Sequence, residues 1–279
     1  LPARTEPLTE DMKVSIAQYI ADNNEALTLL HKAAAIDNCR YPVDLSSGFE
    51  VRLNHLSKLK KSMMLLSLEA VSNAENNKSQ SAADSVISGF SLARSLVKEP
   101  VFISQLVRIA CHGLATSVLE RAINRTVFTD EQLAEFDRCL VEAEDHSALA
   151  RAYAGDRCPF LDALKKPESL KSAITGNHMP ITPFLDLYIA VGLADMDIIF
   201  YLDFIDGYIE ITKLPLHQRQ KASDALKAGL GSVSNIHVLL KNHTPSLLRI
   251  IMIELREIAG LYAARTGLAL GVGMAEGQP

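Results

Sequence analysis

The stretch 100–124 contains the side chains best placed to do chemistry. Its polar residues recur about every four positions and are Gln105, Arg108, His112, Thr116 and Glu120. That spacing places them on one slowly drifting face of a helix whose other faces are apolar, a pattern typical of a buried helix. A guanidinium cannot readily lose its charge, so a buried one needs an acceptor. We therefore expect a carboxylate or several backbone carbonyls beside Arg108.

Two interpretations of this polar face are open. In the first, Gln105, Arg108 and His112 form a structural network whose members satisfy one another. In the second, the same residues line a ligand-binding or catalytic pocket, together with Arg40 and Tyr41 from a turn-rich loop. We favour the first interpretation and assign no catalytic residue.

The sequence contains none of the common catalytic or nucleotide-binding motifs. It has no G-x-x-x-x-G-K-[ST], no G-x-G-x-x-G, no H-E-x-x-H and no G-x-S-x-G. A di-iron site needs a carboxylate three residues before a histidine on two helices, whereas Glu142 and His146 are four apart. Asp203, Asp206 and Glu210 share a helix face that could hold a divalent cation, but a solvated acidic face is the simpler interpretation. No metal and no cofactor is predicted.

The four cysteines are too widely spaced to indicate a zinc site. Cys111 and Cys139 fall in helical patterns and are predicted to be small core residues. Cys39 and Cys158 lie beside predicted loops, and whether they form a disulfide is left open because spacing alone does not fix their geometry.

Charge and hydropathy limit the partners of the chain. The 279 residues are 48% hydrophobic, and 33 acidic against 28 basic side chains give a net charge of −5. The basic residues are scattered along the sequence, which argues against nucleic-acid binding. The longest apolar run, 184–201, is interrupted by aspartates, so no transmembrane segment is predicted. Because the sequence begins at Leu1 rather than at a methionine, we expect that a leader, anchor or tag was removed.

Every long apolar segment has a period near 3.6 residues, which predicts an all-α fold. We expect a multi-helix array or orthogonal bundle around the central helix 100–124, in a single domain covering 1–279. Glycines and prolines make 154–183 the most interrupted region, and a boundary between two subdomains is predicted there. Gly113 predicts a close approach of a neighbouring backbone. The last helix is predicted to start with Thr244 and Pro245 and to end at Gly267.

Residues 63–97 are similar to a tetratricopeptide-type helical hairpin. Val86, Phe90 and Ala93 have the spacing small-x3-aromatic-x2-Ala of the second helix in that repeat. Pro100 comes two residues late, the first helix lacks the repeat's signature, and no second copy is present. A long repeat array is therefore not predicted.

Three segments of the chain resemble an uncharacterised family of helical bacterial proteins, many of them made with an N-terminal leader or anchor. The segments are LNHLSKLKKSMMLLSLEAV, SLARSLVKEPVFISQLVRIACHGLA and LREIAGLYAARTG. The resemblance implies an extracytoplasmic or periplasmic location, with the cytoplasm as the alternative. It implies no activity.

Together these patterns predict a non-enzymatic helical scaffold or protein-interaction module whose partner is another protein. The alternative is a small-molecule-binding protein or enzyme with a polar pocket around Arg108 and His112. A ligand-sized pocket beside Arg108 would favour the alternative, and a tightly packed polar face would favour the scaffold.

Overall fold

The computed structural model describes residues 1–166, 183–231 and 237–276, and in these ranges the chain is helical without any strand. The all-α prediction is confirmed. The helices are α1 (Glu10–Asp22), α2 (Asn24–Ala34), α3 (Asn54–Glu75), α4 (Ser79–Arg94), α5 (Phe102–Ile123), α6 (Asp130–Ala143), α7 (Ser147–Lys165), α9 (Pro183–Ala190), α10 (Leu193–Lys213), α11 (Leu216–Gly231) and α12 (Val238–Glu276), with a 3-10 segment η1 (Leu45–Glu50).

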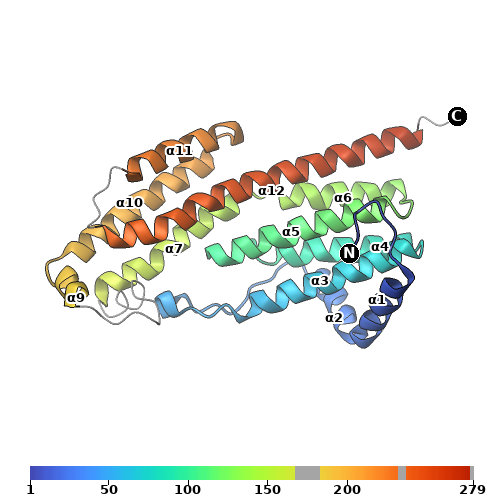
Figure 1. The fold of residues 1–279 in the computed structure, drawn as a ribbon, viewed down its shortest axis with the longest axis horizontal. Coiled ribbons are helices and arrows are strands. Elements are labelled where there is room, and N and C mark those ends of the chain that lie inside the picture. Colours follow the sequence, from blue (N-terminus) through green and yellow to red (C-terminus); the bar gives the residue numbers. More distant parts are fainter. Residues whose placement is uncertain (167–182, 232–236, 277–279) are drawn as a thin grey trace.

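The helices form an elongated array organised along α5 and α12 (Figure 1). The long helix α12 runs beside α5 and follows most of the long axis of the molecule. Helices α1 to α4 and α6 gather around one end of this pair, and α7 and α9 to α11 gather around the other. The predicted central helix is therefore the element that the two groups of helices share.

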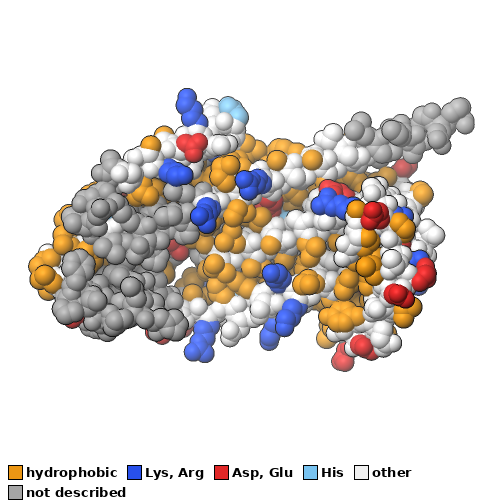
Figure 2. Space-filling model, in the orientation of Figure 1, with side chains coloured by type: hydrophobic (Ala, Val, Ile, Leu, Met, Phe, Trp, Pro, Cys, Tyr) orange, Lys and Arg blue, Asp and Glu red, His pale blue; other side chains and the backbone are white. Residues whose placement is uncertain are grey.

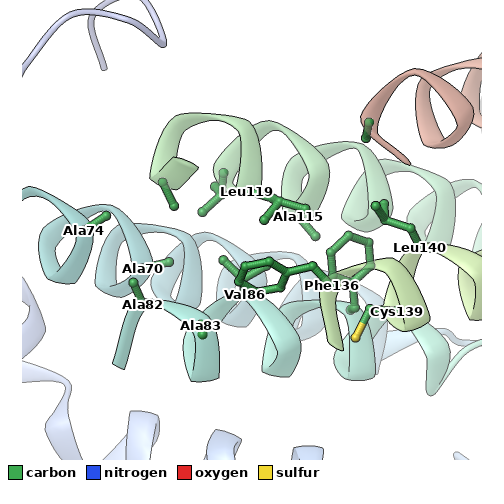
Figure 3. Packing of buried hydrophobic residues seen from close by; sticks show 14 of the residues in the cluster. Ala70, Ala74, Ala82, Ala83, Val86, Ala115, Leu119, Phe136, Cys139 and Leu140 are labelled. Atoms are coloured by element: carbon green, nitrogen blue, oxygen red, sulfur yellow. The ribbon is translucent and has the colours of Figure 1, made fainter. Parts of the chain in front are cut away.

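Each end of the array has its own apolar core. The first core joins α3, α4, α6, the C-terminal part of α5 and the C-terminal part of α12. Figure 3 shows how small residues such as Ala70, Ala82 and Ala115 let these helices approach closely around Val86 and Phe136. The second core joins α7, α10, the first turn of α5 and the N-terminal part of α12. Its largest members are buried tyrosines, and among them the rings of Tyr153 and Tyr208 stack with centroids 5.1 Å apart.

Two helix boundaries follow from the chemistry of the residues that form them. Thr129 begins α6 with a capping box, in which its Oγ1 accepts from the Gln132 amide at 3.3 Å and its own amide donates to Gln132 Oε1 at 2.9 Å. Asn77 has φ +55° in the turn between α3 and α4, a conformation that asparagine tolerates better than most residues. Helices α3 and α4 pack as the predicted hairpin, with Phe90 and Ala93 buried.

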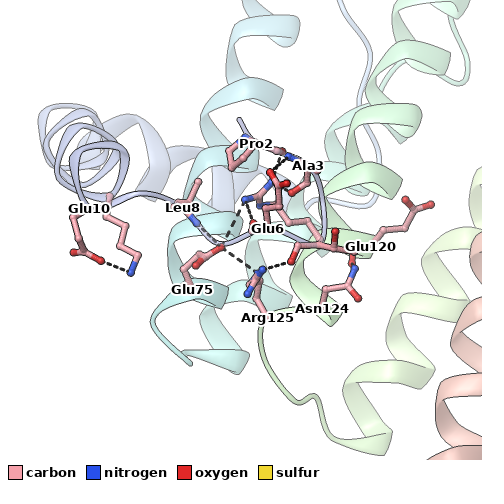
Figure 4. Close-up of polar contacts among 12 residues, drawn as sticks. Pro2, Ala3, Glu6, Leu8, Glu10, Glu75, Glu120, Asn124 and Arg125 are labelled. Atoms are coloured by element: carbon pink, nitrogen blue, oxygen red, sulfur yellow. Dashed lines mark hydrogen bonds and ion pairs between the residues drawn. The ribbon is translucent and has the colours of Figure 1, made fainter.

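An N-terminal segment, residues 1–8, is fixed across α3 and α5 (Figure 4). Arg121 of α5 is buried and donates to the carbonyl oxygens of Pro2 at 3.0 Å and Glu6 at 2.8 Å. The Glu75 carboxylate accepts from the Leu8 amide at 3.3 Å and forms an ion pair with Arg125 at 3.4 Å. A buried charge without hydrogen-bond partners is costly. The backbone of the segment supplies such partners to the Arg121 guanidinium.

The predicted ends of the last helix are wrong. Helix α12 begins at Val238, passes through Pro245 and continues past Gly267 to Glu276. Between Pro245 and Gly267, the side chains of Ile251, Leu261 and other apolar residues are buried in the two cores. Tertiary packing of this face stabilises the helix by more than proline and glycine destabilise it.

The predicted boundary at 154–183 is not a break in secondary structure where the structure describes it. Helix α7 continues through Gly155 and Pro159 to Lys165, with Tyr153 and Phe160 buried in the second core. Residues 167–182 of the predicted boundary lie outside the described residues. The two cores meet elsewhere, along α5 and α12.

Among the described residues, α5 is the one helix whose length and composition would allow it to cross a membrane. In the array, 61% of its most apolar window is buried by the surrounding helices. The core helix of a soluble protein meets the same criterion, so α5 is weak evidence for a membrane span.

The glycine expected to permit a close backbone approach is the wrong one. A Cβ on Gly113 would meet nothing within 4 Å, whereas a Cβ on Gly155 of α7 would lie 2.0 Å from the Pro100 carbonyl oxygen. Gly155 therefore sets how closely α7 approaches the turn before α5.

This difference predicts opposite effects for two alanine substitutions. Gly113→Ala should raise the free energy of unfolding by about 0.5 to 1 kcal/mol through helix propensity. Gly155→Ala should lower it by roughly 1 to 3 kcal/mol, because rigid backbone must move to admit the methyl group. Urea unfolding measures both, and a stabilising Gly155→Ala would contradict the packing described for α7.

Candidate functional site

A buried polar layer separates the two apolar cores. Helix α5 contributes Gln105, Arg108 and His112, and α12 contributes Glu254 and Glu257. Along α12 these two glutamates follow residues of the second core and precede residues of the first. We call these five residues, with Arg219 of α11, the polar layer. The predicted polar face of the central helix is therefore its buried face.

On the α5 side of the polar layer, Gln105 makes three hydrogen bonds. Its Nε2 donates to the carbonyl oxygens of Leu96 at 2.9 Å and Glu99 at 2.8 Å, and its Oε1 accepts from Arg108 Nε at 2.7 Å. Arg108 also donates to the Ala143 carbonyl at the end of α6, at 3.4 Å. Its hydrogen-bond acceptors among the described residues are thus an amide and one backbone carbonyl, not the expected carboxylate or set of carbonyls. Gln105 fixes the guanidinium and ties α5 to the turn that follows α4.

The α12 side of the polar layer supplies two carboxylates. His112 Nδ1 donates to Glu257 Oε1 at 2.6 Å, and both side chains are almost fully buried. Burial lowers the pKa of His112 below its ordinary value, although Glu257 acts in the opposite direction. Arg219 NH1 donates to Glu254 Oε2 at 3.1 Å. Burial raises the pKa of Glu254 to about 7, and Arg219 offsets only part of that effect.

The cavity beside the polar layer is too small for an organic ligand. It measures about 20 Å³ and is lined by Arg108, His112, Phe90 and neighbouring residues of α4 and α6. A water molecule needs roughly 10 to 15 Å³ by this measure, whereas ligand pockets span roughly 300 to 1,000 Å³. The arrangement can hold a water molecule and keep His112 neutral, but it offers no room for a substrate.

The other two predicted site residues lie away from the polar layer. The Tyr41 hydroxyl bonds to Ser95 Oγ at 2.9 Å, and its ring stacks on His55 with centroids 4.3 Å apart. His55 in turn forms an ion pair with the buried Glu99 at 2.9 Å. Arg40 is exposed and does not line the pocket beside Tyr41. Of the five predicted residues, the structure brings together only Gln105, Arg108 and His112.

Sequence reasoning did not find the partners of the polar layer. Glu254 and Glu257 lie in the last helix, of which the sequence predicted the two ends but no polar contact, and 145 residues separate His112 from Glu257. The available signal was the polarity of the buried face, because polar side chains buried on α5 need hydrogen-bond partners from the elements packed against it.

A second polar cluster contains the residue types of a nucleophilic triad. His31 of α2 bonds through Nδ1 to Ser88 Oγ at 2.8 Å and through Nε2 to Glu69 Oε2 at 2.7 Å. The cluster borders a groove of about 430 Å³. Ser88 is buried in the middle of α4, where backbone N–H groups are used by the helix and cannot form an oxyanion hole. The geometry therefore fits a clamp that fixes α2 to α3 and α4.

The predicted acidic face on α10 is mostly exposed. Glu210 pairs with Lys213 at 2.6 Å, and Asp206 pairs with Arg157. Asp197 is instead buried and accepts from Tyr188 at 2.5 Å. No group of three potential ligands among the described residues could hold a metal ion.

The two predicted core cysteines are buried as expected, whereas Cys158, predicted to lie beside a loop, lies within α7. Cys111 and Cys139 are buried in the first core, and burial raises the pKa of each thiol to about 11. Cys39 and Cys158 are exposed free thiols, so the disulfide left open by the sequence is not formed. Lys and Arg side chains are spread over the face shown in Figure 2 rather than gathered in one patch, which agrees with their scatter in the sequence.

The contacts of Gln105 predict that removing this acceptor lowers the free energy of unfolding more than removing the charge of Arg108. Gln105→Leu should lower the free energy of unfolding by roughly 3 to 5 kcal/mol, because it strands a buried guanidinium and frees two carbonyls. Arg108→Met removes the charge itself and should cost about 1 to 3 kcal/mol. Urea unfolding of both variants provides the comparison, and a larger loss for Arg108→Met would contradict a structural role for the polar layer.

His31 predicts a pH-dependent contribution to stability. Glu69 raises the pKa of His31 above its ordinary value of 6.5 in the folded protein. The stability that protonated His31 gains from Glu69 is therefore fully present below pH 6.5. It is lost as the pH rises through the pKa of His31 in the folded protein. The difference in unfolding free energy between the wild type and His31→Gln should shrink as the pH rises above 6.5. A difference that stays constant from pH 5.5 to 9 would show that protonated His31 does not hold α2.

Comparison with known proteins leaves the chain without an assigned family. No protein-family model, curated protein or solved structure matches it. The resemblance to exported helical proteins stays an expectation from the sequence.

Proposed function

We propose that this protein is a non-enzymatic helical scaffold that binds another protein. The observation that carries the proposal is the packing of the polar layer. The side chains best suited to chemistry, Arg108 and His112, bond to Gln105, the Ala143 carbonyl and Glu257, around a cavity of about 20 Å³. Because Arg108 and His112 already bond to groups of the protein itself around so small a cavity, they have little capacity left to recognise a substrate.

The surface of α9 and α10 supports a protein partner. Five large apolar side chains within fourteen residues are exposed there: Leu187, Val191, Met196, Ile199 and Phe200. Concentrations of exposed apolar residues are characteristic of protein-interaction sites, whereas single ones are common on any surface. We propose that the partner contacts this apolar surface, defined by these five residues, with an apolar surface of its own.

We further propose an extracytoplasmic location. The support is the resemblance of three segments to exported bacterial proteins. Fractionation of the source cells tests this part, and recovery of the protein only with the cytoplasmic fraction would exclude it.

Partner capture tests the scaffold function. The wild type, immobilised and mixed with an extract of its source cells, should retain a defined partner that chemical cross-linking places at α9 and α10. The double variant Ile199→Asp, Phe200→Asp should lose that partner. Val127→Asp replaces an exposed apolar residue far from the apolar surface and should keep it. Equal recovery with all three proteins, or no reproducible partner, would contradict the proposal.

The competing function, anion binding at Arg108, makes a different prediction. If Arg108 binds an external carboxylate, phosphate or sulfate, that anion should raise the melting temperature of the protein by mass action on the folded state. The scaffold proposal predicts no saturable increase. A saturable increase that is abolished by Arg108→Met would replace the scaffold with a small-molecule-binding function.

A further inference from the structure

The structure contains a ligand-sized pocket that is separate from the polar layer. It measures about 330 Å³ and lies between the end of α2, the loop that follows it and the end of α4. Its apolar walls come from Leu30, Ala34, Ile36, Leu92 and Val97. The volume is near the lower limit of roughly 300 to 1,000 Å³ for small-molecule sites, so the pocket suits a small ligand.

The wall at Tyr41 is held in place without a ligand. Ser95 Oγ donates to the Leu92 carbonyl at 2.6 Å, so the Tyr41 hydroxyl is the donor in its 2.9 Å bond to Ser95. The Tyr41 ring also stacks on His55, which pairs with Glu99. A wall that is already ordered lowers the entropic cost of binding a ligand. The hydroxyl oxygen of Tyr41 keeps capacity to accept one further hydrogen bond.

Three charged residues line the pocket: Arg94, Lys98 and Asp37. Arg94 is neutralised by Glu142 at 2.7 Å. Lys98 Nζ contacts the neutral amide of Asn38 at 3.3 Å, and no carboxylate of the described residues pairs with it. Asp37 lies on the same rim, is exposed and forms no ion pair with Lys98. An apolar pocket with separate positive and negative groups at its mouth is complementary to an apolar molecule with both an anionic and a cationic group.

We propose that this pocket binds a free apolar α-amino acid. Its side chain would occupy the apolar walls, its carboxylate would face Lys98 and its ammonium group would face Asp37. The Tyr41 hydroxyl oxygen could also accept a hydrogen bond from the ammonium group. The proposal is independent of the scaffold function, because the pocket and the apolar surface of α9 and α10 share no residue.

Three molecules with the same phenyl group test this assignment. L-phenylalanine has both charges, 3-phenylpropanoate has only the carboxylate, and 2-phenylethylamine has only the ammonium group. Titration of the full chain, followed by protein NMR chemical shifts, should give saturable binding of L-phenylalanine at least roughly tenfold tighter than either comparator, as expected for the loss of one charge-assisted contact. Tighter binding of 3-phenylpropanoate would identify a monoanion site and overturn the proposal. Absence of binding by all three would overturn it as well.

Variants locate the binding in the pocket. Lys98→Met and Asp37→Asn should each weaken the binding of L-phenylalanine roughly tenfold. Ala33 is an exposed residue of α2 that lines the pocket, so Ala33→Trp should block binding while the circular dichroism spectrum and melting temperature stay unchanged. Lys61→Met removes an exposed lysine of α3 that does not line the pocket and should bind like the wild type. Unchanged binding in Ala33→Trp would place the ligand elsewhere and refute the assignment.

Discussion

The buried polar layer determines how the two ends of this protein fit together. Arg108 and His112 on α5 lie in the interior, where a charge or polar group left without a partner is costly. The Arg108 contact with Ala143 of α6 and the His112 contact with Glu257 of α12 hold only for one register of α5 against those helices. A shift of one helical turn would move apolar residues into the polar layer and charged residues into a core. The layer therefore specifies the alignment that apolar packing alone would leave less restricted.

The features predicted correctly from the sequence are those that depend on neighbouring residues. Apolar periodicity predicted an all-α fold and identified α5 as the central helix. The failures occurred where distant packing acts against a local preference. Helix α12 continues through Pro245 because both cores bury its apolar side chains. No other part of the protein lies within 4 Å of a Cβ placed on Gly113. The close backbone approach that requires a glycine is between Gly155 of α7 and Pro100.

The residues of the candidate site could be predicted from the sequence, but only some of the groups that they contact could. The spacing of Gln105, Arg108 and His112 put them on one face, and the structure brings them together. The acidic partner of His112, Glu257 on α12, could not be read from spacing, because a contact across 145 residues leaves no local pattern. Tyr41 was selected as a loop residue and lines the separate pocket, whereas Arg40 from the same loop is exposed. Chain topology, which short-range patterns do not specify, decides which of two adjacent loop residues faces the interior.

The polar layer is a structural network in which Arg108 and His112 bond to groups of the protein itself. The most direct test is a titration of His112, with ¹³C-labelled histidine observed by NMR and assigned with His112→Gln. In such a network the pKa of His112 lies below its ordinary value of 6.5, because burial disfavours the charged ring more than Glu257 stabilises it. Addition of phosphate, sulfate or acetate should leave that pKa unchanged. A pKa of 6.5 or higher, or one that moves with added anion, would mean that His112 is open to solvent and ligands and would contradict the account.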